Sequence, residues 1–416
     1  MGLMPSDDEN KARPAPSERS GGFGGGAGHD PRLLNEPRLR AMMERNRLDL
    51  LFIASPVNSK YLSGFFHNSG DHDATVGARP FVVLYFLDDA KAPAMLVPAV
   101  DLHLAMDSSW IVDVRGYVAA ERRIDLDVPL FDDVFSAAAS VLADRGVKTA
   151  TIGTEGSQLP VSLGTRLDRF LAGHRLVDVS RDLGLVRMVK TPEEVRRIRA
   201  AVDCTMKAHE SFRAAARPGV SDRELYLAAA MRMLEEGSEA AKFIFVGTGP
   251  TRYAANARFP TGHLLQRGDF LRADLGASFL GYGADFVRSY FLGDAARRPR
   301  EVWSRLCEAE VELGQSVRIG ETGGDIYQRG LAAISSHLDR FPREFVGHGI
   351  GLILNEEPRM DASNRVEVEP GTVYCTEFSF YLDDGVRLHV EDMFLITEQG
   401  VEMLTRDCPR DLVIPC

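Results

Sequence analysis

Hydrophobic and polar positions follow different patterns in the two halves of the chain. In the first half, segments with helical spacing of apolar residues, such as 38–48 and 134–146, alternate with short apolar runs such as 81–87. Helices that alternate with strands at this spacing are typical of an α/β domain. We therefore predict an α/β domain with a largely parallel or mixed sheet over residues 31–185.

The second half begins with helices and continues with strands. Thr191 and Glu194 have the spacing of a capping box, which predicts the start of a long helix. Ser221 and Glu224 repeat this spacing and predict the start of a second helix. Helices that are separated along the chain from the strands favour an α+β fold, which we predict for residues 186–416.

Composition limits the function classes. The chain has 416 residues and a net charge of −11 that is spread along its length, which argues against a nucleic-acid binder. Its five cysteines form no CxxC pair, so we expect a reduced, cytoplasmic compartment. The strongest apolar run, 81–87, is too short to span a bilayer, and no membrane segment is predicted. Residues 1–30 are rich in Pro, Gly, Ser and charge, which predicts a disordered tail.

Four carboxylates lie inside runs that otherwise resemble buried strands. Asp274 and Asp285 are in two successive runs, and a hairpin would bring them close together. Glu377 and Glu391 lie symmetrically about the Asp-Gly dipeptide at 384–385, which is a strong hairpin signal. A symmetric register would set these two glutamates opposite one another.

Such pairs require cations. Like charges that face each other destabilise a sheet by about 0.2–1 kcal/mol, and by more where the dielectric constant is low. Two divalent ions would remove this cost, because carboxylates are hard oxygen ligands. His348, between glycines after a helical segment and ahead of a strand, supplies an imidazole. Each residue alone has a simpler explanation as a paired or solvated group, but together they predict a dinuclear site.

The order of these motifs resembles the ligand series of the pita-bread metallohydrolases, the family of Xaa-Pro aminopeptidase, prolidase, methionine aminopeptidase and creatinase. The motifs are DLG, DFVRSY, GHGIG, NEEP, TEFSF and HVED, and the resemblance covers about residues 190–397. The preceding α/β domain resembles the creatinase-type N-terminal domain. The resemblance implies an α+β pita-bread catalytic domain from the prolidase and creatinase branch.

The resemblance also implies the role of each residue. Asp274 and Asp285 would bind one metal ion, and Asp285 and Glu391 would bridge to a second. His348 and Glu377 would complete the second site, and Glu377 would act as general base. Two divalent ions are implied, and manganese, cobalt, zinc and iron all suit these ligands. The two-domain relatives imply a homodimer.

Some positions depart from the family pattern. Ala257 and Asn355 occupy positions where the peptidases have histidines, and His389 replaces an arginine. The missing histidines would provide acid–base help that is typically worth about 10²–10⁴-fold, and Asn355 cannot carry a proton at neutral pH. We expect Asn355 to bind substrate and His389 to be catalytic, and His263 could compensate. His67 lies on a loop that in relatives reaches across a dimer to a neighbouring active site, which implies substrate binding. The alternative is that this loop is simply solvated.

Three functions are compatible with these observations. The first is a dinuclear metallohydrolase that cleaves a C–N bond in a short peptide, most like an Xaa-Pro dipeptidase or aminopeptidase. The second is a creatinase- or ectoine-hydrolase-like enzyme, or a lyase, that acts on a small non-peptide compound. The third is a binding module that kept the fold and lost catalysis, which the presence of all five ligands disfavours. The fold alone does not decide between them.

Overall fold

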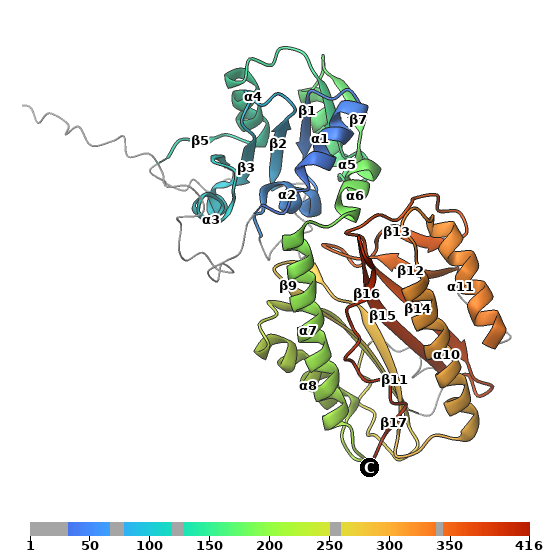
Figure 1. Ribbon diagram of the computed structural model, residues 1–416. Helices are drawn as coiled ribbons and strands as arrows, with labels where there is room; N and C mark the ends of the chain where they lie inside the picture. The colour runs from blue at the N-terminus through green and yellow to red at the C-terminus, as the bar shows by residue number, and fades with distance from the viewer. Residues whose placement is uncertain (1–31, 67–78, 119–127, 250–258, 338–343) are drawn as a thin grey trace, which may run out of the picture. The chain divides into compact units, whose positions relative to one another are not determined.

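The computed structural model describes residues 32–66, 79–118, 128–249, 259–337 and 344–416 (Figure 1). The tail predicted for residues 1–30 lies outside this range. The chain divides into two compact units between Arg181 and Asp182, a few residues before the predicted boundary.

The first unit is built on a mixed sheet, as the sequence predicts. Its described strands have the order β5-β4-β3-β2-β1-β6-β7, and β1 pairs parallel with β6 but antiparallel with β2. The strands are β1 (Leu50–Ile53), β2 (Val82–Phe86), β3 (Ala94–Pro98), β4 (Asp113–Tyr117), β5 (Leu130–Phe131), β6 (Thr151–Thr154) and β7 (Arg175–Asp178). Every residue of β1, β2 and β3 is buried, which is typical of central strands that are covered on both faces.

The helices of this unit cover the sheet with apolar faces. They are α1 (Glu36–Arg45), α2 (Pro56–Ser63), η3 (Ala99–Asp101), α3 (Leu102–Ser108), α4 (Val134–Asp144) and α5 (Val161–Phe170), and α6 (Ser180–Met188) crosses the boundary. In α4, Asp133 caps the first turn and exchanges hydrogen bonds with Ser136. Val141 and Phe135 of the same helix are buried in the core cluster of this unit.

The second unit contains two five-stranded sheets in the described part of the chain. The first sheet holds β8 (Ala240–Gly249), β9 (Phe270–Phe279), β10 (Tyr282–Gly283), β11 (Phe286–Leu292) and β17 (Val413–Ile414). The second sheet holds β12 (Phe345–Gly349), β13 (Glu356–Asp361), β14 (Val373–Tyr381), β15 (Arg387–Thr397) and β16 (Gly400–Met403). The sheets meet where β11 lies beside β15, and Ser289 Oγ donates to His389 O and accepts from His389 N.

Four described helices cover these sheets from outside. They are α7 (Pro192–Ala215), α8 (Asp222–Glu235), α10 (Arg297–Ser316) and α11 (Gly323–His337). Helices α7 and α8 pack on β9 and β8, whereas α10 and α11 pack on the second sheet, and Figure 1 shows the strands between these helix pairs. This arrangement confirms the predicted α+β class and leaves the inner faces of the strands for the functional site.

Both predicted capping boxes are present. Thr191 Oγ1 accepts from Glu194 N at 3.3 Å, and Glu194 Oε2 accepts from Thr191 N at 2.7 Å. Ser221 and Glu224 form the same reciprocal pair at the start of α8. Gly237 follows the end of α8 with a φ of 95°, a conformation that suits glycine.

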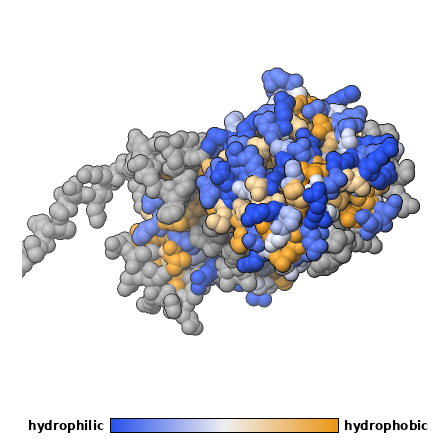
Figure 2. Space-filling view, turned by 90° about the horizontal axis from the view of Figure 1, so that it is seen from below, coloured by the Kyte–Doolittle hydropathy of each residue, from blue (hydrophilic) through white to orange (hydrophobic). Residues whose placement is uncertain are grey.

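The face of the molecule that Figure 2 shows is mainly hydrophilic among its described residues. Figure 2 shows one face of the molecule, where polar residues cover most of the coloured area and apolar residues are scattered between them. Among the described residues, no helix is both long and apolar enough to cross a membrane.

Replacing Thr191 with alanine is expected to lower the free energy of unfolding of the second unit by about 0.5–2 kcal/mol, because Glu194 N loses its acceptor. Urea denaturation can be followed through the buried Trp303, which belongs to this unit. Thr191→Ser is the matched control, since it keeps the hydroxyl. Equal unfolding midpoints for Thr191→Ala and the wild type would contradict this role of the box.

Candidate functional site

The hairpin of β14 and β15 brings two glutamates face to face. Glu377 pairs directly with Glu391, as the symmetric register about the Asp-Gly turn predicts. The turn is closed by a hydrogen bond from Leu382 N to Val386 O, and Gly385 has a φ of 86°. Residues that lie opposite one another in an antiparallel pair project from the same face, so both buried carboxylates enter the same space.

The two aspartates converge from the other sheet. Asp274 on β9 pairs with Val287 rather than with Asp285, which directly precedes β11. The aspartates are therefore diagonal neighbours instead of facing residues. One carboxylate oxygen from each nevertheless lies within 4.8 Å of the other and of an oxygen of Glu391.

His348 completes the group from β12 and not from the connection between helix and strand that the sequence suggested. Its flanking glycines allow close strand approach, because a Cβ at Gly347 would lie 2.1 Å from Cys375 O. His348 Nε2 lies 3.8 Å from Asp285 Oδ2, and it lies 3.9 and 3.7 Å from the Oε1 atoms of Glu377 and Glu391.

The tautomer of His348 suits a cation. Its Nδ1 lies 3.0 Å from Gly349 O, and a carbonyl oxygen can only accept a hydrogen bond. In the neutral ring the proton therefore belongs on Nδ1, and Nε2 presents its lone pair to the carboxylates. A carbonyl partner that fixes the ring in this way is usual for metal-binding histidines.

These side chains line one pocket with a volume of about 500 Å³, a size that accommodates small molecules. The other lining residues are Phe243, Phe245, Arg272, Phe345, Leu354, Asn355, Arg387 and His389. His389 Nε2 lies 3.1 Å from Glu377 Oε2, within hydrogen-bonding distance.

The remaining candidates from the sequence are elsewhere. His263 is absent from the described lining and pairs with Asp269 at 2.6 Å, which gives it a local partner instead of the compensating role considered for it. His67 and Ala257 lie outside the described residues. Of the residues predicted to contact substrate, Asn355 and His389 therefore line the same described pocket as the four carboxylates.

Sequence reasoning missed Arg272 and Arg387. Arg272 is two residues before Asp274 on β9, so both side chains project from the same face of the strand. Arg387 is two residues before His389 on β15, in the same relation. Counting back in steps of two from the recognised residues would have found both arginines.

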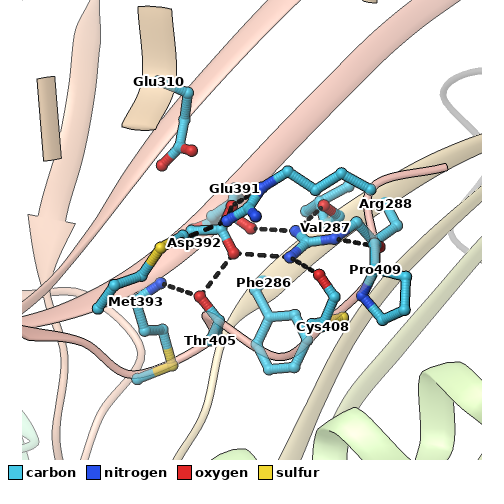
Figure 3. A network of polar contacts seen from close by, with 12 residues as sticks. Phe286, Val287, Arg288, Glu310, Glu391, Asp392, Met393, Thr405, Cys408 and Pro409 are labelled. Atoms are coloured by element: carbon cyan, nitrogen blue, oxygen red, sulfur yellow. Dashed lines mark hydrogen bonds and ion pairs between the residues drawn. The ribbon is translucent and has the colours of Figure 1, made fainter. Parts of the chain in front are cut away.

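A buried polar network holds the opposite face of the hairpin (Figure 3). Arg288 is fully buried, and it donates to Asp392 Oδ1 at 2.6 Å and to Glu391 O at 2.8 Å. Arg410 Nη2 donates to Asp392 Oδ2 at 2.8 Å, and Thr405 Oγ1 donates to Oδ1 at 2.5 Å. Burial alone would lower the pKa of Arg288, but the Asp392 carboxylate outweighs this effect and raises it. The backbone at Glu391 and at the following residue is thereby fixed.

Glu310 on α10 supports the neighbouring strand. Its Oε1 accepts from Thr376 Oγ1 at 2.5 Å, and Thr376 directly precedes Glu377. Burial, followed by the negative charge of Asp392, raises the pKa of Glu310 well above its usual range. Both effects disfavour a negative charge on Glu310. Both strands that carry the pocket glutamates therefore have polar anchors on their outer face.

Comparison with known families assigns both units. The model of the Creatinase/Prolidase N-terminal domain matches residues 37–189, and the model of Metallopeptidase family M24 matches residues 196–398. The chain belongs to metallopeptidase family M24. It is accordingly a metal-dependent hydrolase in which a creatinase-type domain precedes the pita-bread catalytic domain.

Relatives extend over nearly the whole length of this M24 protein. The Xaa-Pro dipeptidase of Pyrococcus furiosus is 25% identical over 373 residues, which cover 89% of this chain and 97% of the relative. The crystal structure of dipeptidase PepE from Mycobacterium ulcerans has a TM-score of 0.75 at 25% identity and covers 94% of this chain and 100% of that one. The X-Pro aminopeptidase of Thermotoga maritima has a TM-score of 0.74 at 22% identity, with coverages of 91% and 99%.

The donor set of this M24 protein fits divalent metal ions. Four carboxylates and one imidazole nitrogen offer the oxygen and nitrogen ligands that such ions prefer. The group of Asp274, Asp285 and Glu391 is compact enough to share an ion. His348 Nε2 also faces three carboxylates at 3.7–3.9 Å. A nitrogen lone pair and carboxylate oxygens repel one another, and a cation between them removes this repulsion.

Asp392→Asn is expected to lower the free energy of unfolding by about 3–5 kcal/mol, because it leaves the buried charge of Arg288 without its carboxylate. Chemical denaturation measures this loss. The matched control is Asp294→Asn, an exposed partner of Arg300, which is expected to unfold close to the wild-type midpoint. An equally small effect of Asp392→Asn would show that the buried network does not anchor the hairpin.

Proposed function

We propose that this M24 protein is a dinuclear metallopeptidase that hydrolyses short peptides with a free C-terminal carboxylate, as an Xaa-Pro dipeptidase does. The observation that carries the proposal is the convergence of Asp274, Asp285, His348, Glu377 and Glu391 in one pocket. The relative of Pyrococcus furiosus that is named an Xaa-Pro dipeptidase supports the substrate class.

The five residues would divide between two ions. Asp274, Asp285 and Glu391 would hold one ion, in agreement with the compact group that they form. His348 and Glu377 would hold the other, with Asp285 and Glu391 shared between the two ions. Divalent ions in these positions would polarise a scissile carbonyl group and lower the pKa of a water molecule.

Glu377 would act as the general base, and His389 would orient its carboxylate. A carboxylate at Glu377 can accept a proton from the attacking water, which is the role of a general base. With its proton on Nε2, His389 donates to Glu377 Oε2 over 3.1 Å and orients that carboxylate. Glu377 would then pass the proton that it accepted to the leaving amine, while His389 keeps the carboxyl group oriented.

The other side of the pocket favours an anionic substrate. Two divalent ions would balance the four carboxylates, and Arg272 and Arg387 add positive charge to the described lining. A guanidinium group binds a carboxylate through parallel hydrogen bonds, so either arginine could hold a peptide terminus. Phe243, Phe245 and Phe345 supply apolar surface that suits the ring of a proline residue.

A second candidate function rests on Asn355. The carboxamide lies in the pocket lining at a position where the family's peptidases have a histidine, and it can orient a substrate but cannot transfer a proton. This favours a small non-peptide compound, which a creatinase- or ectoine-hydrolase-like enzyme or a lyase would act on. A panel of Xaa-Pro dipeptides, creatine and ectoine with manganese-loaded protein would distinguish the two candidates.

Removal of metal by a chelator is expected to abolish hydrolysis, and added manganese, cobalt, zinc or iron should restore it. His348→Ala is expected to reduce the bound metal from about two ions to one or fewer per chain and to abolish turnover. Elemental analysis and dipeptide hydrolysis measure the two effects. His263→Ala is the matched control, and full metal content in His348→Ala would exclude this histidine as a ligand.

Arg387→Met is expected to raise KM for Xaa-Pro dipeptides roughly 10- to 100-fold, because a hydrogen bond to a charged group contributes about 1.5–3 kcal/mol. The change in kcat should be much smaller. Xaa-Pro amides, which lack the terminal carboxylate, should show little difference between variant and wild type. Arg297→Met, at an exposed arginine of α10, is the control, and an equal KM effect on amides would argue against carboxylate binding.

A further inference from the structure

A thiol lies next to the imidazole of His348, on the neighbouring strand and behind the described pocket lining. Cys375 on β14 pairs with His348 on β12 and with Met393 on β15, so the three side chains form one row. The next row on this face, two residues along each strand, is Glu377 with Glu391. Cys375 is fully buried, which places its sulfur beneath the acidic group and away from solvent.

The separation of the donor atoms matches a single coordination sphere. Cys375 Sγ, a ring nitrogen of His348 and a carboxylate oxygen of Glu391 all lie within 4.8 Å of one another. Zinc binds thiolate sulfur at about 2.3 Å and nitrogen or oxygen at about 2.0–2.2 Å, so ligands of one tetrahedral ion are roughly 3–4 Å apart. Small side-chain adjustments would bring these three atoms to one ion.

The position of this thiol distinguishes it from the other cysteines. Within the described residues, Cys375 is the cysteine that belongs to a group of possible metal ligands. Cys307 is half-buried on α10, which packs on the outer side of β14 and β15. Cys307 therefore provides a matched control for any effect of removing a thiol.

We propose that Cys375 is a further ligand of the metal ion held by His348 and Glu391. As the sulfur–metal bond forms, the S–H bond breaks and its proton passes to a carboxylate of the acidic group, such as Glu391, and from there through the pocket to solvent, so that the ligand is a thiolate. A thiolate is a soft ligand, and it would bias this position toward zinc, cobalt or iron over manganese. The inference rests on the metal centre of the proposed function.

The structure also shows the competing role for this residue. Cys375 Sγ donates to Asp285 O at 3.4 Å, and Asp285 N donates to Met393 Sδ at 3.3 Å. The peptide groups of Asp285 thus lie between two sulfur atoms. If this were the whole function of Cys375, the thiol would hold the backbone of a metal ligand without touching the ion.

X-ray absorption at the zinc edge separates these roles. Zinc-loaded wild type and Cys307→Ser are expected to show sulfur at about 2.3 Å from zinc. Cys375→Ser should lose this shell while it still binds zinc. Cobalt-loaded protein provides a second readout, since the near-ultraviolet sulfur-to-cobalt charge-transfer band of the wild type should disappear in Cys375→Ser.

Metal preference gives a further check. In competition experiments, the affinity of the wild type for zinc relative to manganese is expected to fall at least about tenfold in Cys375→Ser, a change typical of losing a group that supports a metal. Cys307→Ser should leave this ratio unchanged.

The outcomes test the thiolate assignment separately from the metallopeptidase proposal. Zinc surrounded only by oxygen and nitrogen in the wild type would overturn the thiolate assignment and leave the metallopeptidase proposal intact. A protein that takes up no zinc, cobalt or manganese would overturn both. The wild-type spectrum alone decides the thiolate, even if Cys375→Ser does not fold.

Discussion

Repulsion between buried carboxylates is the constraint on which the catalytic unit depends. Two like charges 4 Å apart cost about 4 kcal/mol at an effective dielectric constant of 20, and this site gathers four carboxylates. The fold resists this repulsion through hydrogen bonds and an ion pair that fix β14 and β15 on the face opposite the pocket glutamates. Arg288 holds Asp392 and the carbonyl of Glu391, while Glu310 holds Thr376. The acids are therefore kept close enough to bind cations together.

Much of this arrangement could be predicted from local patterns. The capping boxes define the starts of α7 and α8, and the Asp-Gly turn sets Glu377 opposite Glu391, because both signals act over a few residues. The diagonal placement of Asp274 and Asp285 could not be predicted in the same way. Their connection includes Leu280 and Gly281 at positive φ and the short strand β10, and these shift the register.

Other features depend on contacts between distant segments. The network of Arg288 joins β11 to β15 and to the backbone of Cys408, which no spacing in the sequence reveals. The pocket also joins distant segments, because Arg272 and Arg387 come from strands of two different sheets. The M24 fold thus fixes the position of the acidic group and His348, whereas these less regular positions shape the rest of the pocket.

The register of the β14–β15 hairpin makes its exposed tip less tolerant of change than most surface turns. Side chains alternate between faces, so one residue inserted near Asp383 or Asp384 would shift one strand by a single position. Asp392 or Val390 would then enter the pocket in place of Glu391, and Glu391 would turn toward the buried guanidinium. Loop tips commonly accept insertions, but here a length change of one would exchange the inner and outer polar residues.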